Sequence, residues 1–309
     1  MSHGVFRVVG DLLRPGDLLV VNDSRVIPAR LPATRKGGGS AEILLLRPIP
    51  DEPGRWEALV RPSRRIRPGE ALLLLGGDRV EVGESLGDGT RAVRFDRDPY
   101  LVMADAGEMP LPPYIRDRST APEGYQTVYA DPPGSAAAPT AGLHFTAELL
   151  QSIEAAGVEF AHVTLHVGLD TFRPLEGTFI DEHHIHREWY EIPRRTQEAI
   201  AGATRAGGRV IAVGTTSVRV LETAERDGLS TGWTDLYITP PHAFGGVDAL
   251  ITNFHLPRSS LLVLVTAFVQ AGMHAATPLD ARDTLLAAYR TALAEGYRFF
   301  SFGDAMFIA

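Results

Sequence analysis

From Thr146 to its end, the sequence alternates between segments with helical periodicity and short apolar segments, and this alternation restricts the fold most strongly. Thr146 is suited to cap the first helix, and Gly157 to end it. The expected helices are residues 147–156, 196–206, 215–226, 259–271 and 280–295, and the expected strands are 158–167, 209–213, 235–238, 249–254 and 298–302. Such alternation predicts a mostly parallel sheet or barrel that is covered by helices.

An earlier apolar segment, residues 17–26, predicts a further buried strand of this sheet. Its apolar part runs into the polar sequence Asn22-Asp23-Ser24-Arg25. Catalytic groups are often found where a rigid strand gives way to a loop.

The segment between these two regions has a different pattern. Its short alternating or apolar runs are separated by Gly, Pro and Asp, and they lie at residues 41–47, 55–60, 71–75, 79–82 and 91–95. Short strands of this kind predict a small antiparallel barrel or sandwich. The 309 residues therefore predict two domains: an α/β domain at 1–32 and 110–309, and an inserted all-β domain at 33–109.

Composition excludes several classes of site and compartment. The chain has no cysteine, which rules out disulfides, thiolate nucleophiles, iron–sulfur clusters and cysteine-bound zinc. The best apolar run, residues 261–269, is far shorter than the roughly 18 residues of a membrane span. The N-terminal residues lack the features of a signal peptide, so we expect a cytoplasmic protein that does not interact with a membrane.

The formal net charge of −8 argues against nucleic-acid binding over the whole surface. Lysine is nearly absent, however, and Arg61, Arg64, Arg65 and Arg67 lie close together, near Trp56. Because arginine grips phosphate with two donors and stacks on bases, this segment is either an RNA contact or a solvated turn.

Nucleotide-binding motifs of the G-x-G-x-x-G and P-loop types are absent from the sequence. Gly214-Thr215-Thr216-Ser217 instead joins an expected strand to an expected helix. Free backbone N–H groups and three hydroxyls at this point suit a phosphate or carboxylate, although a simple helix cap has the same composition.

Histidines gather near the expected loops. His144 follows Thr140-Ala141-Gly142, His162 and His166 share one face of a strand, and His255 follows Asn253. A further cluster combines His183, His184 and His186 with Asp181, Glu182 and Glu188. A metal site is disfavoured because H-E-x-x-H is absent, so the group favours acid–base catalysis or a polar substrate pocket.

Aromatic residues near these loops would either stack on a purine or pack in the core. They are Tyr114, Tyr125, Tyr129, Phe145 and Phe172.

Several long segments, in one order, resemble the S-adenosylmethionine:tRNA ribosyltransferase-isomerase family. They are residues 22–30, 110–115, 125–130, 138–146, 164–168, 186–190, 214–219, 252–257 and 297–306. The family usually begins with a further segment before the position matched by Phe6.

The resemblance implies a transferase of queuosine biosynthesis. Such enzymes transfer and isomerise the ribosyl moiety of S-adenosylmethionine onto 7-aminomethyl-7-deazaguanine at the tRNA wobble position, giving epoxyqueuosine-tRNA, adenine and methionine. S-adenosylmethionine is then a consumed substrate, and no cofactor or metal is expected. The implied fold is an α/β barrel-like major domain interrupted by a small β-barrel minor domain, and we expect a monomer.

The implied chemistry needs a base near C5′ of the sulfonium substrate, an acid for the departing adenine and a pocket poor in water. The residues expected to transfer protons are Asp23, His144, His166, His186 and Glu188. Those expected to bind substrate are Arg25, Tyr114, Gln126, Thr127, Tyr129, Thr140, Gly142, Thr215, Thr216, Ser217, Arg219, Asn253 and His255.

Two other functions compete with this interpretation. One is a catalytically silent tRNA- or nucleoside-binding homologue that lacks the family's N-terminal segment. The other is a methyltransferase, which the missing glycine-rich turn disfavours. For tRNA binding we expect a local positive patch that includes Arg61, Arg64, Arg65 and Arg67, or Arg116 and Arg118.

Overall fold

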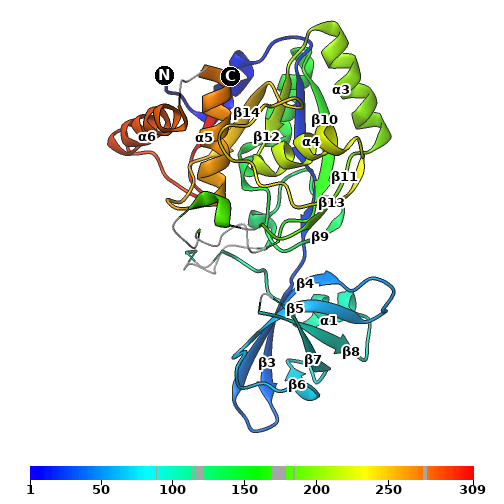
Figure 1. Ribbon diagram of the computed structural model, residues 1–309. Helices are drawn as coiled ribbons and strands as arrows, with labels where there is room; N and C mark the ends of the chain where they lie inside the picture. Colours follow the sequence, from blue (N-terminus) through cyan, green and yellow to red (C-terminus); the bar gives the residue numbers. More distant parts are fainter. Residues whose placement is uncertain are drawn as a thin grey trace. The chain divides into compact units, whose positions relative to one another are not determined.

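The chain forms two compact units in the computed structural model (Figure 1). The first comprises Met1–Ser24, Tyr125–Pro132 and Ala138–Ala309, and the second comprises Arg25–Gly124 and Pro133–Ala137. The structure describes residues 1–87, 89–112, 114–115, 122–168, 175, 179–183, 185–273 and 277–309. Each unit has its own sheet structure and is described by itself.

The first unit, here the α/β unit, is built on a seven-stranded sheet with the order β13-β11-β10-β1-β12-β14-β15. The strands are β1 (Leu18–Asn22), β10 (Glu159–Leu165), β11 (Glu188–Glu191), β12 (Val210–Val213), β13 (Thr231–Thr234), β14 (Ala249–Asn253) and β15 (Ala305–Ile308). The four central strands β10, β1, β12 and β14 are parallel to one another. The outer pairs, β10 with β11, β11 with β13 and β14 with β15, are antiparallel. Every residue of β1 is buried, as expected for an apolar run covered on both faces.

The α/β unit also contains helices and short helical turns. They are η1 (Phe6–Leu12), η3 (Thr140–His144), α2 (Ala147–Ala155), η5 (Ile180–Glu182), α3 (Arg194–Ala206), α4 (Thr215–Asp227), α5 (Ser260–Met273) and α6 (Pro278–Ala294). Helices α3 and α4 contact β1, β10 and β12. Side chains of η1, η3 and α2 pack with Leu19 and Val21 of β1 in a separate buried cluster.

The second unit, here the barrel unit, contains a closed six-stranded antiparallel barrel with the order β3-β4-β5-β8-β7-β6. Its strands are β3 (Arg30–Arg35), β4 (Ser40–Pro48), β5 (Arg55–Arg61), β6 (Glu70–Leu74), β7 (Arg79–Gly87) and β8 (Thr90–Phe95). The unit also holds helix α1 (Pro99–Ala106) and the parallel pair β2 (Arg25–Val26) and β9 (Pro133–Ser135); the short turn η2 (Pro122–Tyr125) lies at its border. Alternating burial along β5 fits strands with one face toward the barrel interior.

The predicted fold class, an α/β domain with an inserted small β-barrel, is confirmed, but details differ. The barrel unit extends beyond the predicted 33–109, because β3 begins at Arg30 and the parallel pair β2 and β9 also belongs to this unit. Helix α1 was not predicted, although Asp98 caps it and Pro99 begins it.

Two predicted strands are wrong. Residues 235–238 form no strand, since the partner of β11 is the preceding polar segment β13. Residues 298–302 also form no strand: Phe300 has a φ of 73°, and Asp304 N–H donates to the carbonyl of Arg298, which closes a turn before β15.

Among the described residues, no single helix has both the length and the apolar character that a membrane span needs. Helices α5 and α6 meet the length and composition criteria only when they are combined, and their axes are bent by 107°.

Candidate active site

The carboxyl ends of β1, β10, β12 and β14 meet at one edge of the parallel part of the sheet. The chain runs from β1 to β10 on one side and later to β12 on the other side of β1. Open α/β sheets bind their ligands beyond such a reversal of strand order. Most of the predicted site residues lie at this edge.

Asn22 ties the ends of β1 and β10 together. Its Nδ2 donates to the carbonyl of Leu165 over 3.1 Å, and its Oδ1 accepts the N–H of Leu165 over 3.0 Å. The same oxygen accepts the N–H of Ser24 over 3.1 Å. These bonds fix the loop that carries Asp23 and Ser24.

Asp23 is buried against the polar face of β10. Its Oδ1 accepts a 2.7 Å hydrogen bond from the hydroxyl of Thr164, and its Oδ2 lies 3.9 Å from Nδ1 of His162. Burial raises the pKa of Asp23, although the Thr164 hydroxyl and His162 oppose this shift. Burial also lowers the pKa of His162, against the pull of the Asp23 carboxylate. A carboxylate with a raised pKa is a stronger base than an ordinary one.

Ser24 holds the second histidine of this strand face. Its hydroxyl lies 2.8 Å from Nδ1 of His166, and the imidazole stacks on Trp189 with ring centroids 5.3 Å apart. Burial lowers the pKa of His166 to about 4. The ring is therefore neutral at pH 7, and its contact at Nδ1 fixes its orientation.

The N-terminus of α4 follows β12 through Gly214, whose φ of 88° favours glycine. The hydroxyl of Ser217 donates a hydrogen bond to the backbone carbonyl of Val213 over 2.9 Å. The hydroxyl of Thr216 is buried and has no hydrogen-bond partner among the described residues. A free hydroxyl beside unpaired helix N–H groups is suited to an anionic ligand group.

One turn further along α4, Arg219 forms a buried ion pair with Glu188 of β11. Its Nε donates to the carbonyl of Leu236 over 3.2 Å, and its Nη2 has no partner in the described part of the chain. The other Glu188 oxygen accepts the N–H of Gly168 over 2.7 Å. Because both of its oxygens are occupied, Glu188 is better placed to orient Arg219 than to carry a proton.

Asn253, the last residue of β14, brings η3 to the same edge. It contacts the hydroxyl of Thr140 over 3.0 Å through Oδ1 and Nε2 of His144 over 3.3 Å through Nδ2. His144 also stacks on Phe6 at 4.8 Å. Burial lowers the pKa of His144.

Gly142 allows Tyr129 to approach the η3 turn closely. A Cβ at position 142 would lie 2.1 Å from the Tyr129 hydroxyl and 2.8 Å from Cγ2 of Thr127. The hydroxyl of Thr127 is buried without a partner among the residues that the structure describes. Burial raises the pKa of Tyr129, so its phenol stays protonated.

His255 lies deeper than the other histidines. Its Nε2 is 2.8 Å from the hydroxyl of Thr252, and its backbone N–H donates to the phenol of Tyr289 over 3.0 Å. Burial lowers its pKa to about 4. This geometry favours a structural role for His255 over the predicted substrate contact.

Some predicted residues are not brought to this edge by a described contact. Arg25 is exposed and Tyr114 half-buried, and both belong to the barrel unit. Gln126 and His186 are half-buried in the α/β unit, so their predicted roles stay predictions. His184, Phe172, Arg116 and Arg118 lie outside the described residues.

No three His, Asp or Glu side chains in the described ranges come close enough together to hold a metal ion.

Three residues that organise the site, His162, Thr164 and Ser24, are missing from the list of predicted site residues, although His162 is predicted to share a strand face with His166. A signal was available, since His162, Thr164 and His166 follow the two-residue period of one strand face. Their contacts with Asp23 and Ser24 depend on the register of β1 against β10, which pairs Asn22 with Val163.

Comparison with known proteins identifies one family over the whole length of the chain. Residues 1–308 match a family described as "Queuosine biosynthesis protein". The S-adenosylmethionine:tRNA ribosyltransferase-isomerases of Rubrobacter xylanophilus and Thermus thermophilus are both 50% identical over the full chain, which covers 86% and 88% of them. The crystal structure of the S-adenosylmethionine tRNA ribosyltransferase of Thermotoga maritima aligns with a TM-score of 0.52 at 39% identity, covering all of this chain and 88% of that one. With the predicted motifs at one sheet edge and this similarity throughout, the chain belongs to the queuosine biosynthesis family of S-adenosylmethionine:tRNA ribosyltransferase-isomerases.

Proposed function

We infer that this chain is a tRNA-modifying enzyme that uses S-adenosylmethionine as a ribosyl donor. It transfers and isomerises the ribosyl moiety onto 7-aminomethyl-7-deazaguanine at the tRNA wobble position, and it releases adenine and methionine. The observation that carries this inference is the family match over residues 1–308. Several of the quoted segments, including those with Asp23, His166, Thr216 and Asn253, also lie at the carboxyl ends of neighbouring strands of one sheet.

In this proposal the catalytic base is Asp23 or the neighbouring His166. The sulfonium acidifies C5′ of the substrate, and removal of that proton needs a basic group in a pocket poor in water. Asp23 is buried with a raised pKa, and Thr164 and His162 orient it. His166 is neutral at pH 7 and can accept a proton through Nε2 while Ser24 holds Nδ1.

The N-terminal turn of α4 binds the methionine carboxylate in this proposal. The Thr216 hydroxyl and the Arg219 Nη2 lie three residues apart on this helix, and both lack a hydrogen-bond partner within the ranges that the structure describes. A carboxylate accepts hydrogen bonds from both kinds of donor. Glu188 acts as a positioning residue for Arg219.

In this proposal Asn253, Thr140 and His144 lie near the adenosine end of the substrate. His144, held by Asn253 and Phe6, is the candidate acid for the departing adenine. Tyr129, Thr127, Gln126 and Thr140 are candidate contacts to the nucleoside. We further propose that the enzyme needs no cofactor, works as a monomer and resides in the cytoplasm.

The first experiment measures adenine release by chromatography, using S-adenosylmethionine and tRNA that carries 7-aminomethyl-7-deazaguanine. We expect adenine only with this tRNA and not with unmodified tRNA, together with a mass gain at the wobble base. A folded chain that binds the modified tRNA and releases no adenine would instead favour the silent homologue. Methylated tRNA without adenine would indicate a methyltransferase.

Alanine variants then test the individual roles. We expect His166→Ala and Asp23→Asn to lower kcat by about a hundredfold or more, because general acid–base catalysis typically contributes 10²–10⁴-fold. Full turnover by His144→Ala or His166→Ala would remove that histidine from the mechanism.

A further inference from the structure

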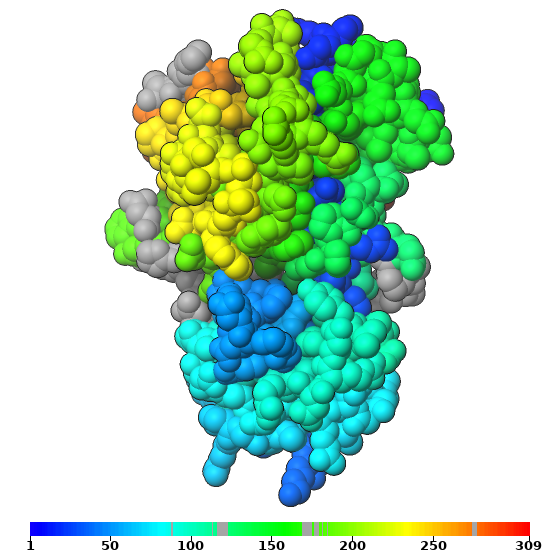
Figure 2. All heavy atoms as spheres, turned by 90° about the vertical axis from the view of Figure 1, so that its right-hand side faces the viewer, coloured from blue at the N-terminus to red at the C-terminus, as the bar shows by residue number. Residues whose placement is uncertain are grey.

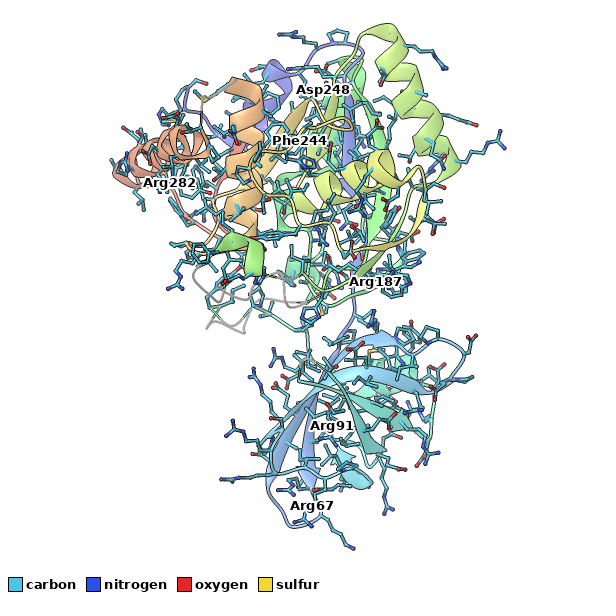
Figure 3. The ribbon with its side chains drawn as sticks, in the orientation of Figure 1. Arg67, Arg91, Arg187, Phe244, Asp248 and Arg282 are labelled. Atoms are coloured by element: carbon cyan, nitrogen blue, oxygen red, sulfur yellow. The ribbon has the colours of Figure 1, made fainter. Side chains whose placement is uncertain are left out.

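One end of the barrel unit carries a cluster of exposed arginine side chains. Residues 61–69, which lead from β5 into β6 and are here called the arginine loop, contain Arg61, Arg64, Arg65 and Arg67 and no acidic residue. All four side chains are exposed, and within the described part of the chain none comes within ion-pair distance of a carboxylate. Glu70, whose carboxylate binds Arg35, is the acidic group that Arg67 influences, since Arg67 contributes to lowering the pKa of Glu70. Arg67 is labelled at this end of the barrel in Figure 3.

Most other arginines of the barrel unit form ion pairs with carboxylates. Those that pair with carboxylates are Arg30 with Glu42, Arg35 with Glu70, Arg47 with Glu57, Arg55 with Glu52 and Glu84, Arg94 with Glu81, and Arg97 with Asp78 and Asp105. Arg79 is exposed without such a pair, but it lies opposite Leu73, toward the other end of β6. Surface pairing is thus the rule for this barrel, and the arginine loop departs from it.

The arginine loop is also anchored through its backbone. Arg91 donates to the carbonyl of Ile66 over 3.2 Å, and Arg35 donates to the carbonyl of Arg65 over 2.8 Å. The N–H of Arg67 donates to Glu70 over 3.2 Å, and the side chain of Ile66 is only 3% exposed. A loop held in this way loses less conformational entropy when it binds a partner.

Neighbouring groups add to the positive charge. Lys36 is exposed in the turn between β3 and β4, which projects from the barrel unit in Figure 2 (blue), and Arg35 connects this turn to the arginine loop. Arg91 is buried, and its three hydrogen bonds go to backbone carbonyls of Gly83 and Ile66. Glu42 faces Arg61 across the barrel strands, but its carboxylate binds Arg30.

We propose that the arginine loop binds the sugar–phosphate backbone of the tRNA substrate. This proposal rests on the proposed function, which makes tRNA the acceptor. The chain as a whole carries a charge of −8, so its remaining surface repels RNA, and binding needs a local positive surface. Arginine binds phosphate through a planar pair of donors, and four arginines on one anchored loop offer several such contacts.

The test compares two triple variants of the full chain that lose the same charge. R64Q/R65Q/R67Q removes three unpaired arginines of the loop, and the control R55Q/R94Q/R97Q removes three paired arginines of the same barrel. The probe is tRNA carrying 7-aminomethyl-7-deazaguanine, and its Kd is measured over a range of salt concentrations. For the loop variant we expect Kd to rise by about tenfold to a hundredfold at physiological salt. The slope of log K against log salt should fall by about two to three.

The control variant should bind tRNA within about twofold of the unaltered chain. Both variants should bind S-adenosylmethionine normally, and the loop variant should keep its kcat at saturating tRNA while its KM for tRNA rises. Equal tRNA affinity and salt dependence in the loop variant and the unaltered chain would overturn the proposal, as would an equal loss in the control. If the unaltered chain binds tRNA without releasing adenine, the proposed function fails, whereas the binding comparison still decides the role of the loop.

Discussion

The two units differ in where most of their buried charged groups lie, although both have ion pairs at the surface. In the barrel unit, arginines and carboxylates pair at the surface, as in Arg94 with Glu81. In the α/β unit, Asp23, Glu188 and Arg219 are buried, and Thr216 keeps a buried hydroxyl without a described partner. Buried polar groups cost stability unless they are paired, whereas exposed ion pairs contribute little. The comparison indicates that the α/β unit gives up stability for its site and that the barrel unit does not.

The largest effect is expected from breaking the buried ion pair. Arg219→Met leaves the Glu188 carboxylate buried without its guanidinium. We expect the free energy of unfolding to fall by about 3–5 kcal/mol, measured by chemical denaturation. The double variant with Glu188→Gln should recover part of this loss, because it removes the buried charge. An unchanged denaturation midpoint in Arg219→Met would mean that the buried charges are not essential to this unit.

Mild acid should weaken the α/β unit selectively. Burial lowers the pKa of His166 and of His255 to about 4, well below the value of about 6.5 in an unfolded chain. As pH falls below 6.5, the unfolded chain binds protons that the folded chain does not bind until about pH 4, so stability is lost across this window. At pH 5 the loss is about 2 kcal/mol for each histidine.

Hydrogen exchange at pH 7 and pH 5, corrected for the intrinsic rates, can separate the two units. The residues of the barrel unit, 25–124 and 133–137, include no histidine. Its protection should therefore change less than that of β10 and β14. Equal loss of protection in both units would contradict the assignment of the effect to these histidines.

A smaller effect is expected at Gly142. Gly142→Ala places a methyl group 2.1 Å from the Tyr129 hydroxyl, and such overpacking costs about 1–3 kcal/mol. The control is Gly37→Ala in the barrel unit, where an added Cβ meets no atom within 4 Å. Thermal melting should show a lower Tm for the first variant only. Adding Tyr129→Phe to the Gly142→Ala variant should restore part of the lost Tm. If the Tm does not recover, the strain does not come from the Tyr129 hydroxyl.

The smallest effect is expected on the barrel surface. Arg94→Gln removes the pair with Glu81, in which both side chains are about half exposed. We expect the denaturation midpoint to stay unchanged within error, because solvent already screens these charges. A clear loss of stability would weaken the contrast between the two units.

Much of the fold could be predicted because its elements have strong local signals. The apolar run of β1, the hydroxyl cap of α2 and the glycine-separated barrel strands are all local patterns. The wrong strand at 235–238 shows the limit of this approach. Its apolar residues Leu236 and Ile238 are buried, yet the hydrogen bonds of the sheet are made by polar β13.

Polar residues near the strand ends could be predicted from the sequence, but the contacts between them could not. Asp23, His166 and Asn253 are among the predicted site residues, and the structure places all three at the same edge of the sheet. The bonds of Asp23 to Thr164 and of Ser24 to His166 join residues more than a hundred positions apart, and they depend on strand register. Arg25 and Tyr114 belong to the barrel unit, and their predicted roles in substrate binding stay predictions.

The insertion of the barrel between β1 and its partners has a consequence for synthesis of the chain. All six barrel strands are complete by Phe95, so the six-stranded barrel can close while the ribosome is still translating the rest. The apolar strand β1 ends at Asn22, but β10 does not begin until Glu159 and β12 not until Val210. At bacterial translation rates β1 waits on the order of ten seconds for its first neighbour. We therefore expect nascent chains that end before β10 to expose this strand and to depend on chaperones, although their barrel has already folded.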